Sequence, residues 1–431
     1  MGDIFVKWSA LLPPLLGTLY RRLQRTLASV PLFIESRRLK IAESPELDYK
    51  PVVRALAEFL WITWRNCQHV GYWNHNRDSY FRLNLDLRNG RRAQDYVLMS
   101  EFNPRMRQLN NRTYNAWELF NNKWATSVLF EKLGVRASRL YGHVTRENDG
   151  LYLFRDGKLE RLDQHLAQHD VRLICKPLSY IGGKGIFMIE SSRGTIRIDG
   201  APASFADIEN RAEDFCMLEE YVQQHEALAA FNPSSVNTLR LITVRSPQGG
   251  VDYAGGILRM GRAGSLVDNG GAGGLFVLVD ENGICGAVAK PLKGGYRSFT
   301  KHPDTNVRFE GAVVPFFHEA RALIEHAHRV LGPVHSLGWD VAITEDGPVI
   351  IEVNANWHTT MPQIVGWPGR AIFERYFAPS AGRSISHNVD AAQPAGSKMS
   401  MGEPSANRAR IEDERPSALA ATRPSKDRGD Q

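Results

Sequence analysis

The sequence has few cysteines and no apolar run long enough to cross a membrane. Its four cysteines are widely spaced and form no metal-binding pattern: Cys67, Cys175, Cys216 and Cys285. Scattered cysteines are typical of a reducing compartment, so we expect a cytoplasmic protein. The longest early apolar run, residues 8–20, contains Pro13-Pro14. It is also shorter than the roughly 20 residues that a spanning helix needs.

Arg21, Arg22 and Arg25 follow this apolar run. A short apolar segment beside basic residues can lie on the surface of an anionic membrane, which would give weak peripheral contact through the N-terminus. The alternative, which we favour, is that the run packs against the other helices of the N-terminal region.

Composition divides the chain into three regions. Residues 1–110 have a mainly helical pattern, with an amphipathic helix predicted over 51–67. Residues 111–380 contain predicted strands and helices, including a helix over 316–331 that ends at Gly332-Pro333. Residues 381–431 have almost no large apolar side chains, so we expect a disordered tail. The net charge of +6 is not gathered into a long basic stripe, which argues against a nucleic-acid partner.

Residues 338–354 are the most informative stretch. They read as two apolar strands joined by an acidic turn, with Asp340 on the first strand and Glu352 and Asn354 on the second. Side chains alternate faces along a strand, so Glu352 and Asn354 share one face. Oxygen ligands of this kind suit Mg²⁺, which proteins usually hold through a few carboxylates and nucleotide phosphates. The alternative is a hairpin with polar residues on its solvent face.

The register of this hairpin decides between the two interpretations. If Thr344 pairs with Pro348 across the turn, Asp340 lies directly opposite Glu352 and the oxygen ligands converge. A different turn would place Val353 opposite Asp340 and scatter the set, because the side-chain period of a strand is two.

A second informative stretch, residues 171–190, reads as two apolar strands around a glycine-rich loop, Ser179–Gly185. Glycines let backbone N–H groups approach anionic oxygens closely. Lys176 and Lys184 would add positive charge at the two ends of a triphosphate. The loop leads into a strand, so it is neither a P-loop nor a dinucleotide fingerprint. By itself it is equally an ordinary hairpin.

The strand-like run 215–222 ends in Glu219 and Glu220, and Glu226 follows. A buried strand that ends in carboxylates at a cleft can present backbone groups to an adenine edge and a carboxylate to a ribose. Taken alone, it is more simply a solvated strand end.

Four elements in this chain order resemble the ATP-grasp superfamily: the strand that ends at Lys176, the glycine-rich loop, the strand that ends in Glu219 and Glu220, and the hairpin over 338–354. The resemblance is closest to the sugar-transfer-associated branch, which is related to α-L-glutamate ligases. Three further stretches match that branch: Ser235–Arg240, Leu258–Gly261 and Val267–Gly274. The resemblance covers roughly residues 111–378. It implies an α+β fold in which two α+β subdomains clamp ATP, preceded here by the mainly helical region.

The resemblance also implies roles for the matching residues. Lys123 would be the first nucleotide-binding lysine, and Lys176 would reach the α- and β-phosphates. The loop residues Gly182, Gly183, Lys184 and Gly185 would form a lid over the β- and γ-phosphates.

The hinge residues Glu219, Glu220 and Val222 would read adenine through backbone groups, and Glu226 would bind the ribose. Asp340, Glu352 and Asn354 would be the metal ligands, with Glu352 bridging two Mg²⁺ ions.

One position departs from the pattern of many peptide-forming members. They place an arginine two residues before the first metal aspartate, where this sequence has Gly338. Arg240 or Arg259, from neighbouring strands, would supply the missing charge. Together with Lys184 they form the predicted catalytic set.

The resemblance implies an ATP-dependent carboxylate ligase. A carboxylate would attack the γ-phosphate of ATP to give an acylphosphate, and an amine or another nucleophile would then displace phosphate. The family association suggests cell-surface polysaccharide or sugar-conjugate biosynthesis, with a small-molecule or sugar-linked substrate. Two alternatives keep the fold: a small-molecule kinase, and a non-catalytic nucleotide-binding module of a polysaccharide assembly. The donor, the acceptor and the oligomeric state stay open.

Overall fold

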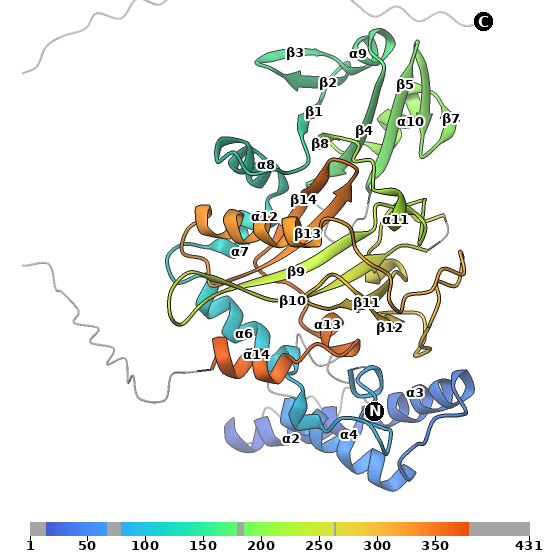
Figure 1. Ribbon diagram of the computed structural model, residues 1–431, viewed down its shortest axis with the longest axis vertical. Coiled ribbons are helices and arrows are strands. Elements are labelled where there is room, and N and C mark those ends of the chain that lie inside the picture. The colour runs from blue at the N-terminus through green and yellow to red at the C-terminus, as the bar shows by residue number, and fades with distance from the viewer. Residues whose placement is uncertain (1–13, 67–78, 179–184, 263, 379–431) are drawn as a thin grey trace, which may run out of the picture. The chain divides into compact units, whose positions relative to one another are not determined.

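Two antiparallel sheets and the helices that cover them make up the described part of the chain (Figure 1). The computed structural model describes residues 14–66, 79–178, 185–262 and 264–378, all within one structural unit. Its helices are α2 (Pro14–Leu27), α3 (Val30–Glu43), α4 (Val52–Asn66), η2 (Ala93–Asp95), α6 (Met99–Asn110), α7 (Ala116–Asn121), α8 (Lys123–Lys132), α9 (Leu162–Gln168), α10 (Phe205–Arg211), α11 (Glu226–Ala229), η3 (Gly270–Ala272), α12 (Phe317–Val330), α13 (Thr360–Ile364) and α14 (Gly369–Tyr376).

The eight-stranded sheet has the order β3-β2-β1-β8-β4-β5-β6-β7. Its strands are β1 (Leu140–Glu147), β2 (Gly150–Arg155), β3 (Lys158–Arg161), β4 (Val171–Pro177), β5 (Phe187–Ser192), β6 (Thr195–Ile198), β7 (Ala201–Ala203) and β8 (Phe215–Glu220). Leu162 and Leu166 of α9 and Ile208 of α10 pack on it in a core of its own.

The six-stranded sheet has the order β12-β11-β10-β9-β13-β14. Its strands are β9 (Thr238–Arg245), β10 (Val251–Met260), β11 (Leu275–Val279), β12 (Cys285–Pro291), β13 (Ser336–Thr344) and β14 (Gly347–Asn354). β9 and β13 are buried almost throughout. Such near-continuous burial requires covering layers on both faces of the sheet.

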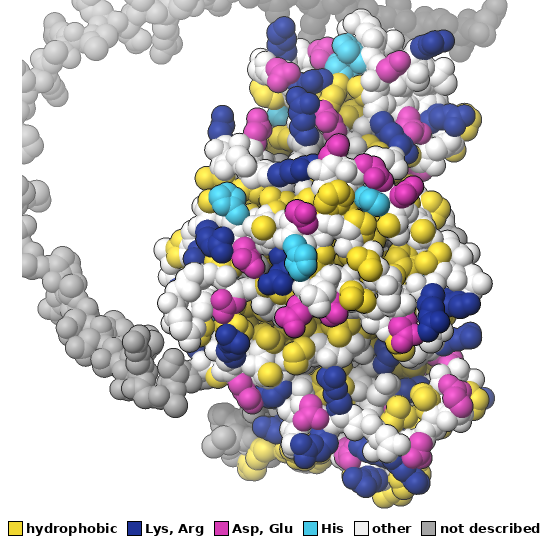
Figure 2. All heavy atoms as spheres, in the orientation of Figure 1, with side chains coloured by type: hydrophobic (Ala, Val, Ile, Leu, Met, Phe, Trp, Pro, Cys, Tyr) yellow, Lys and Arg dark blue, Asp and Glu magenta, His cyan; other side chains and the backbone are white. Residues whose placement is uncertain are grey.

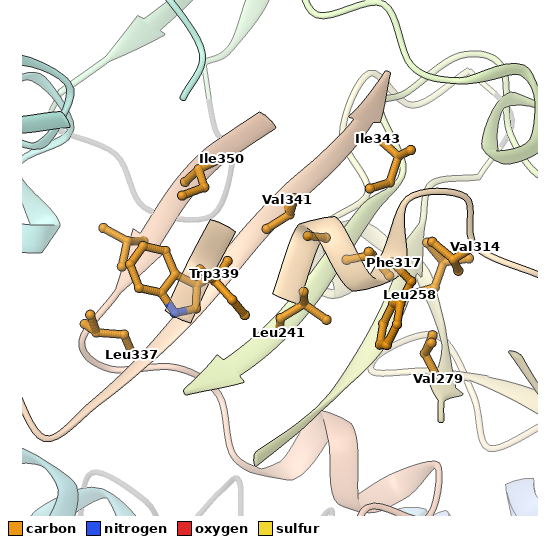
Figure 3. Close-up of a cluster of buried hydrophobic side chains, with 14 of the residues drawn as sticks. Leu241, Leu258, Val279, Val314, Phe317, Leu337, Trp339, Val341, Ile343 and Ile350 are labelled. Carbon is orange, nitrogen blue, oxygen red and sulfur yellow. The ribbon is translucent and has the colours of Figure 1, made fainter. Parts of the chain in front are cut away.

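Alternating side chains of these strands belong to different cores. On one face, Leu241 and Trp339 pack with Phe317 and Ile324 of α12 (Figure 3). On the other face, Ile242 packs with α6 and α14, while Ile257 and Phe276 pack with α3 and α4. The N-terminal helices therefore share a hydrophobic core with the sheet.

Several elements expected from the sequence are confirmed. The amphipathic helix expected over 51–67 is α4, and the helix expected over 316–331 is α12. The turn at Asn282-Gly283 joins β11 to β12, and Gly283 has a φ of 82°. The tail expected to be disordered lies outside the described residues, as do Gly182, Gly183 and Lys184 of the expected lid. None of the described helices combines the length and the apolar character needed to cross a membrane.

His328 of α12 is buried beside Trp339, between α12 and the six-stranded sheet. Its Nε2 lies 2.9 Å from the Val334 carbonyl oxygen, which can only accept, and its Nδ1 lies 2.7 Å from Thr243 Oγ1. These partners suit a neutral imidazole with its hydrogen on Nε2. Burial lowers the pKa of His328 to about 4. Burial likewise lowers the pKa of His335 to about 4.

We predict that acid destabilises the protein through these two histidines. Between pH 6.5 and 4 the unfolded chain binds more protons than the folded one, so the stabilisation is complete above about pH 6.5 and is lost as pH falls towards 4. Each histidine would account for about 3 kcal/mol of that loss, since one pKa unit is worth about 1.4 kcal/mol. Chemical denaturation across this range should show a shallower pH dependence for His328→Gln. The exposed His326→Gln is the matched control, and an unchanged slope in His328→Gln would contradict the assignment.

Candidate functional site

The alternation that builds the core also places charged residues on one face of the six-stranded sheet. Arg240 lies between Leu239 and Leu241, and it pairs across strands with Asp340 on one side and Ile257 on the other. Arg259 follows Ile257 by two residues and therefore shares its face. The same sheet face is thus apolar where the helices cover it and charged around Asp340, in the middle of β13.

A β-bulge in the β13–β14 hairpin places Glu352 of the second strand opposite Asp340 of the first. Thr344 pairs with Gly347 rather than with Pro348, so the turn is one residue tighter than predicted. The ladder then shifts at Ile351, because Val341 pairs with Ile350 whereas Asp340 pairs with Glu352. The predicted pairing of Asp340 with Glu352 is confirmed, but the predicted pairing at the turn is wrong. One extra residue in β14 reconciles the two.

Asp340 is the centre of a buried ion network. Arg240 donates from Nε to Oδ1 at 2.5 Å and from Nη2 to Oδ2 at 2.9 Å. Nη1 of Arg259 lies 2.9 Å from the same Oδ2, and its Nη2 lies 2.8 Å from Oδ1 of Asp268. Thr238 completes the chain by donating to Asp268 from its backbone N–H, at 3.0 Å, and from its hydroxyl.

The electrostatics of this network keep Asp340 ionised. Burial by itself raises the pKa of Asp340, but the two guanidinium groups outweigh it and bring the pKa to about 2. Burial lowers the pKa of Arg259, but Asp268 and Asp340 outweigh it and raise the pKa above its ordinary value. Asp268 has only one guanidinium, and burial raises its pKa despite Arg259.

The two predicted lysines come from other elements. Lys176 lies near the end of β4, and its Nζ donates to Glu219 Oε2 of β8 at 2.5 Å. Lys123 is the first residue of α8, whose N-cap Asn122 accepts from the Ala125 N–H. Its Nζ lies 3.5 Å from Glu352 Oε1, so this ion pair joins α8 to the hairpin.

All these groups line one cavity of about 360 Å³ between the two sheets. It is lined by these predicted residues: Lys123, Lys176, Glu219, Glu220, Val222, Arg240, Arg259, Asp340, Glu352 and Asn354. Glu226 is not among the residues that line it, and lies exposed at the start of α11. Gly185 has a φ of 70° and is exposed just before β5. The ribose role of Glu226 and the lid role of Gly185 stay predictions.

The predicted metal side of the cavity contains a residue that the sequence analysis did not single out. Asn356 lines the cavity two residues after Asn354. Its Oδ1 is buried and has no hydrogen-bond partner among the described residues, and the same holds for Nδ2 of Asn354. Buried polar atoms normally have a partner, so unpaired amides here indicate a place for a ligand. The spacing of two residues between Asn354 and Asn356 is the sequence signal that could have indicated Asn356.

Gly338, where the sequence departs from its relatives, is fixed by packing. A Cβ at this position would lie 2.4 Å from Cβ of Trp357, which is 1% exposed. No larger side chain fits without moving this tryptophan. The nearest guanidinium groups to Asp340 are instead those of Arg240 and Arg259, on the neighbouring strands β9 and β10.

A family model described as sugar-transfer associated ATP-grasp matches residues 101–375, more than half of the chain. The chain belongs to this ATP-grasp family. The match begins in α6, about where the resemblance was expected to begin. No curated protein matches the chain.

Solved ATP-grasp structures show a remote likeness. The biotin carboxylase domain of Hydrogenobacter thermophilus 2-oxoglutarate carboxylase is 12% identical, with a TM-score of 0.34 over 57% of this chain and 45% of that one. D-alanine–D-alanine ligase from Bacillus anthracis is 10% identical, with a TM-score of 0.33 over 61% and 68%. N5-carboxyaminoimidazole ribonucleotide synthetase from Thermotoga maritima is 13% identical, with a TM-score of 0.33 over 66% and 58%. This chain thus covers less than half of the first of these proteins.

The residues of this ATP-grasp protein fit a magnesium ion. Among the described residues, no group of three or more His, Cys, Asp or Glu side chains could hold a metal by itself. Mg²⁺ needs no such cage, because it usually binds one or two carboxylates together with substrate phosphates. Asp340 accepts three hydrogen bonds from the arginines, which leaves about one of its roughly four acceptor sites for a cation.

We predict that Gly338→Ala destabilises the protein by about 1–3 kcal/mol, the usual cost of forcing extra volume into a packed core. The clash with Trp357 is the cause. Gly286→Ala in β12 is the matched control, since its Cβ would lie 3.6 Å from the nearest heavy atom. Equilibrium denaturation of both variants measures the difference. Equal stability of the two variants would contradict the packing argument.

Proposed function

We propose that this protein is an ATP- and Mg²⁺-dependent ligase. It transfers the γ-phosphoryl group of ATP to a carboxylate, which releases ADP and gives an acylphosphate. An amine or another nucleophile then attacks the acyl carbon and displaces phosphate. The observation that carries the proposal is the convergence of Lys123, Lys176, Asp340 and Glu352 on one cavity from both sheets and from α8.

The charges of the cavity support a metal-dependent reaction. Its lining contains four Lys and Arg side chains, namely Lys123, Lys176, Arg240 and Arg259. It also contains five Asp and Glu side chains, namely Glu219, Glu220, Asp268, Asp340 and Glu352. A polyanionic triphosphate gains little from a lining with one more negative group than positive ones. Divalent cations would supply the missing positive charge.

Each part of the lining then has a role in the proposal. Asp340, Glu352 and Asn354 hold Mg²⁺, which when bound neutralises charge on the phosphates. Lys123 and Lys176, held by Glu352 and Glu219, contact the phosphates. Arg240 and Arg259 orient Asp340 and add positive charge where the γ-phosphoryl group would transfer.

The substrate class rests on the family description alone. Its sugar-transfer association supports a role in polysaccharide or sugar-conjugate biosynthesis. The cavity lining also includes Asp268, Asn269 and His358, which could contact the acceptor in this proposal.

We predict that isothermal titration calorimetry detects ATP binding that requires Mg²⁺. Glu352→Gln removes a proposed metal ligand, and Lys176→Met removes a phosphate contact. Each should weaken binding at least tenfold, because a charge-assisted contact is worth about 1.5–3 kcal/mol. Glu374→Gln, at an exposed position of α14, should bind as the unchanged protein does. Binding that is equally strong without Mg²⁺, or unaffected in Glu352→Gln, would overturn the proposal.

The ligase chemistry has a separate test. We predict that hydroxylamine traps the acylphosphate as a hydroxamate when the protein is incubated with Mg·ATP and a panel of sugar acids and amino acids. At least one acid should give hydroxamate together with ADP. Transfer of phosphate to an alcohol with no hydroxamate from any acid would favour the kinase instead.

A further inference from the structure

The N-terminal helix α2 presents its apolar stripe to solvent. Leu16, Leu19, Leu23 and Leu27 are exposed by 53%, 48%, 48% and 55%. At 100° per residue these four positions fall within an arc of about 80° on one side of the helix. The apolar run over residues 8–20 was expected to pack against the other helices, and its described leucines Leu16 and Leu19 are about half exposed.

The polar residues of α2 make the contacts with the protein instead. Arg22 donates from Nε to the Trp64 carbonyl oxygen at 2.5 Å, and its guanidinium lies 4.6 Å from the centre of the Trp64 ring. Thr26, one turn further along, is also buried, and its hydroxyl donates to the Arg22 carbonyl oxygen within α2. α2 is therefore held to α4 by its polar side, and this attachment directs the leucines outward.

The charge around the stripe is positive. α2 contains Arg21, Arg22 and Arg25 and no Asp or Glu. Across residues 14–66 there are nine Lys and Arg and five Asp and Glu, a net charge of +4. On α4, the exposed Trp61 lies under the Arg65 guanidinium, 5.1 Å from the ring centre. Figure 2 shows hydrophobic, basic and acidic side chains mixed over the part of the molecule formed by α2, α3 and α4.

We propose that α2 docks the protein on the surface of an anionic lipid bilayer. A leucine stripe on a short helix without acidic residues, in a region of net positive charge, suits the boundary between headgroups and acyl chains, where the helix lies in the membrane plane. Long arginine side chains reach the phosphates while their methylenes stay on apolar surface. A second copy of this chain is the other candidate occupant of the stripe, and sedimentation velocity without lipid distinguishes the two. The proposal does not depend on the proposed enzymatic activity.

Co-sedimentation of the full chain with vesicles tests the proposal. One set contains phosphatidylcholine alone, and the other contains phosphatidylcholine with phosphatidylglycerol. The protein should sediment with the anionic vesicles and much less with the neutral ones. Binding should weaken as salt is raised, because the screening length falls from about 10 Å at 0.1 M to about 3 Å at 1 M.

Two variants separate the apolar and the electrostatic contributions. Leu19→Glu with Leu23→Glu should weaken binding to anionic vesicles at least about tenfold, since two leucines no longer leave water. Arg21→Glu with Arg25→Glu should abolish the preference for anionic lipid. The matched control is Leu159→Glu with Val313→Glu, at two other exposed apolar positions, and it should bind as the unchanged protein does. Thermal unfolding checks that each variant folds.

Three results would overturn the proposal. The first is the absence of binding to anionic vesicles by the unchanged protein. The second is equal binding by the leucine variant and the control. The third is a dimer in sedimentation velocity without lipid that the leucine variant dissociates, because the stripe would then be an interface between two copies.

Discussion

The extra residue at Ile351 determines what the β13–β14 hairpin can do. The tight turn alone would pair Asp340 with Ile351 and turn Glu352 and Asn354 towards the core of α12. The bulge keeps Ile350 and Val353 in that core and turns the carboxylate and the amide to the cavity. Bulges of this kind re-aim side chains next to functional sites. One face of the hairpin thus packs in the hydrophobic core, and the other face lines the cavity.

In the ion network around Asp340, the attraction of the two arginines outweighs the effect of burial on the carboxylate. Removing charges from water is costly, and a buried pair repays that cost only with good geometry and several hydrogen bonds. Asp340 meets this condition through a two-bond contact with Arg240 and a third contact from Arg259. Strands β9 and β10 fix both arginines on the same face of the sheet, two register positions apart, so the sheet itself positions the charges. Such preorganisation is what stabilises charge that develops during a reaction.

The sequence predicted the elements better than their contacts. Alternating apolar residues and turn glycines located β4, β8 and the β13–β14 hairpin, because these signals are local. The predicted pairing at the turn was wrong, because no distinctive residue marks the bulge at Ile351. The reason for Gly338 could not be predicted either, since Trp357 meets it only in the folded protein. For α2, the sequence showed an apolar run followed by arginines, but only tertiary contacts such as that of Arg22 decide which way the leucines face.

Each of the two lysines that line the cavity forms an ion pair with a carboxylate of the lining. Lys176 pairs with Glu219 in the eight-stranded sheet, and Lys123 pairs with Glu352 of the β13–β14 hairpin. A cation at Glu352 competes with Lys123 for the same carboxylate, and a phosphate competes with Glu352 for the same lysine. Bound together, cation and phosphate satisfy both partners at once, whereas either alone leaves one charge unpaired. The two ligands should therefore bind cooperatively, and coupling of this kind is reciprocal by thermodynamic necessity.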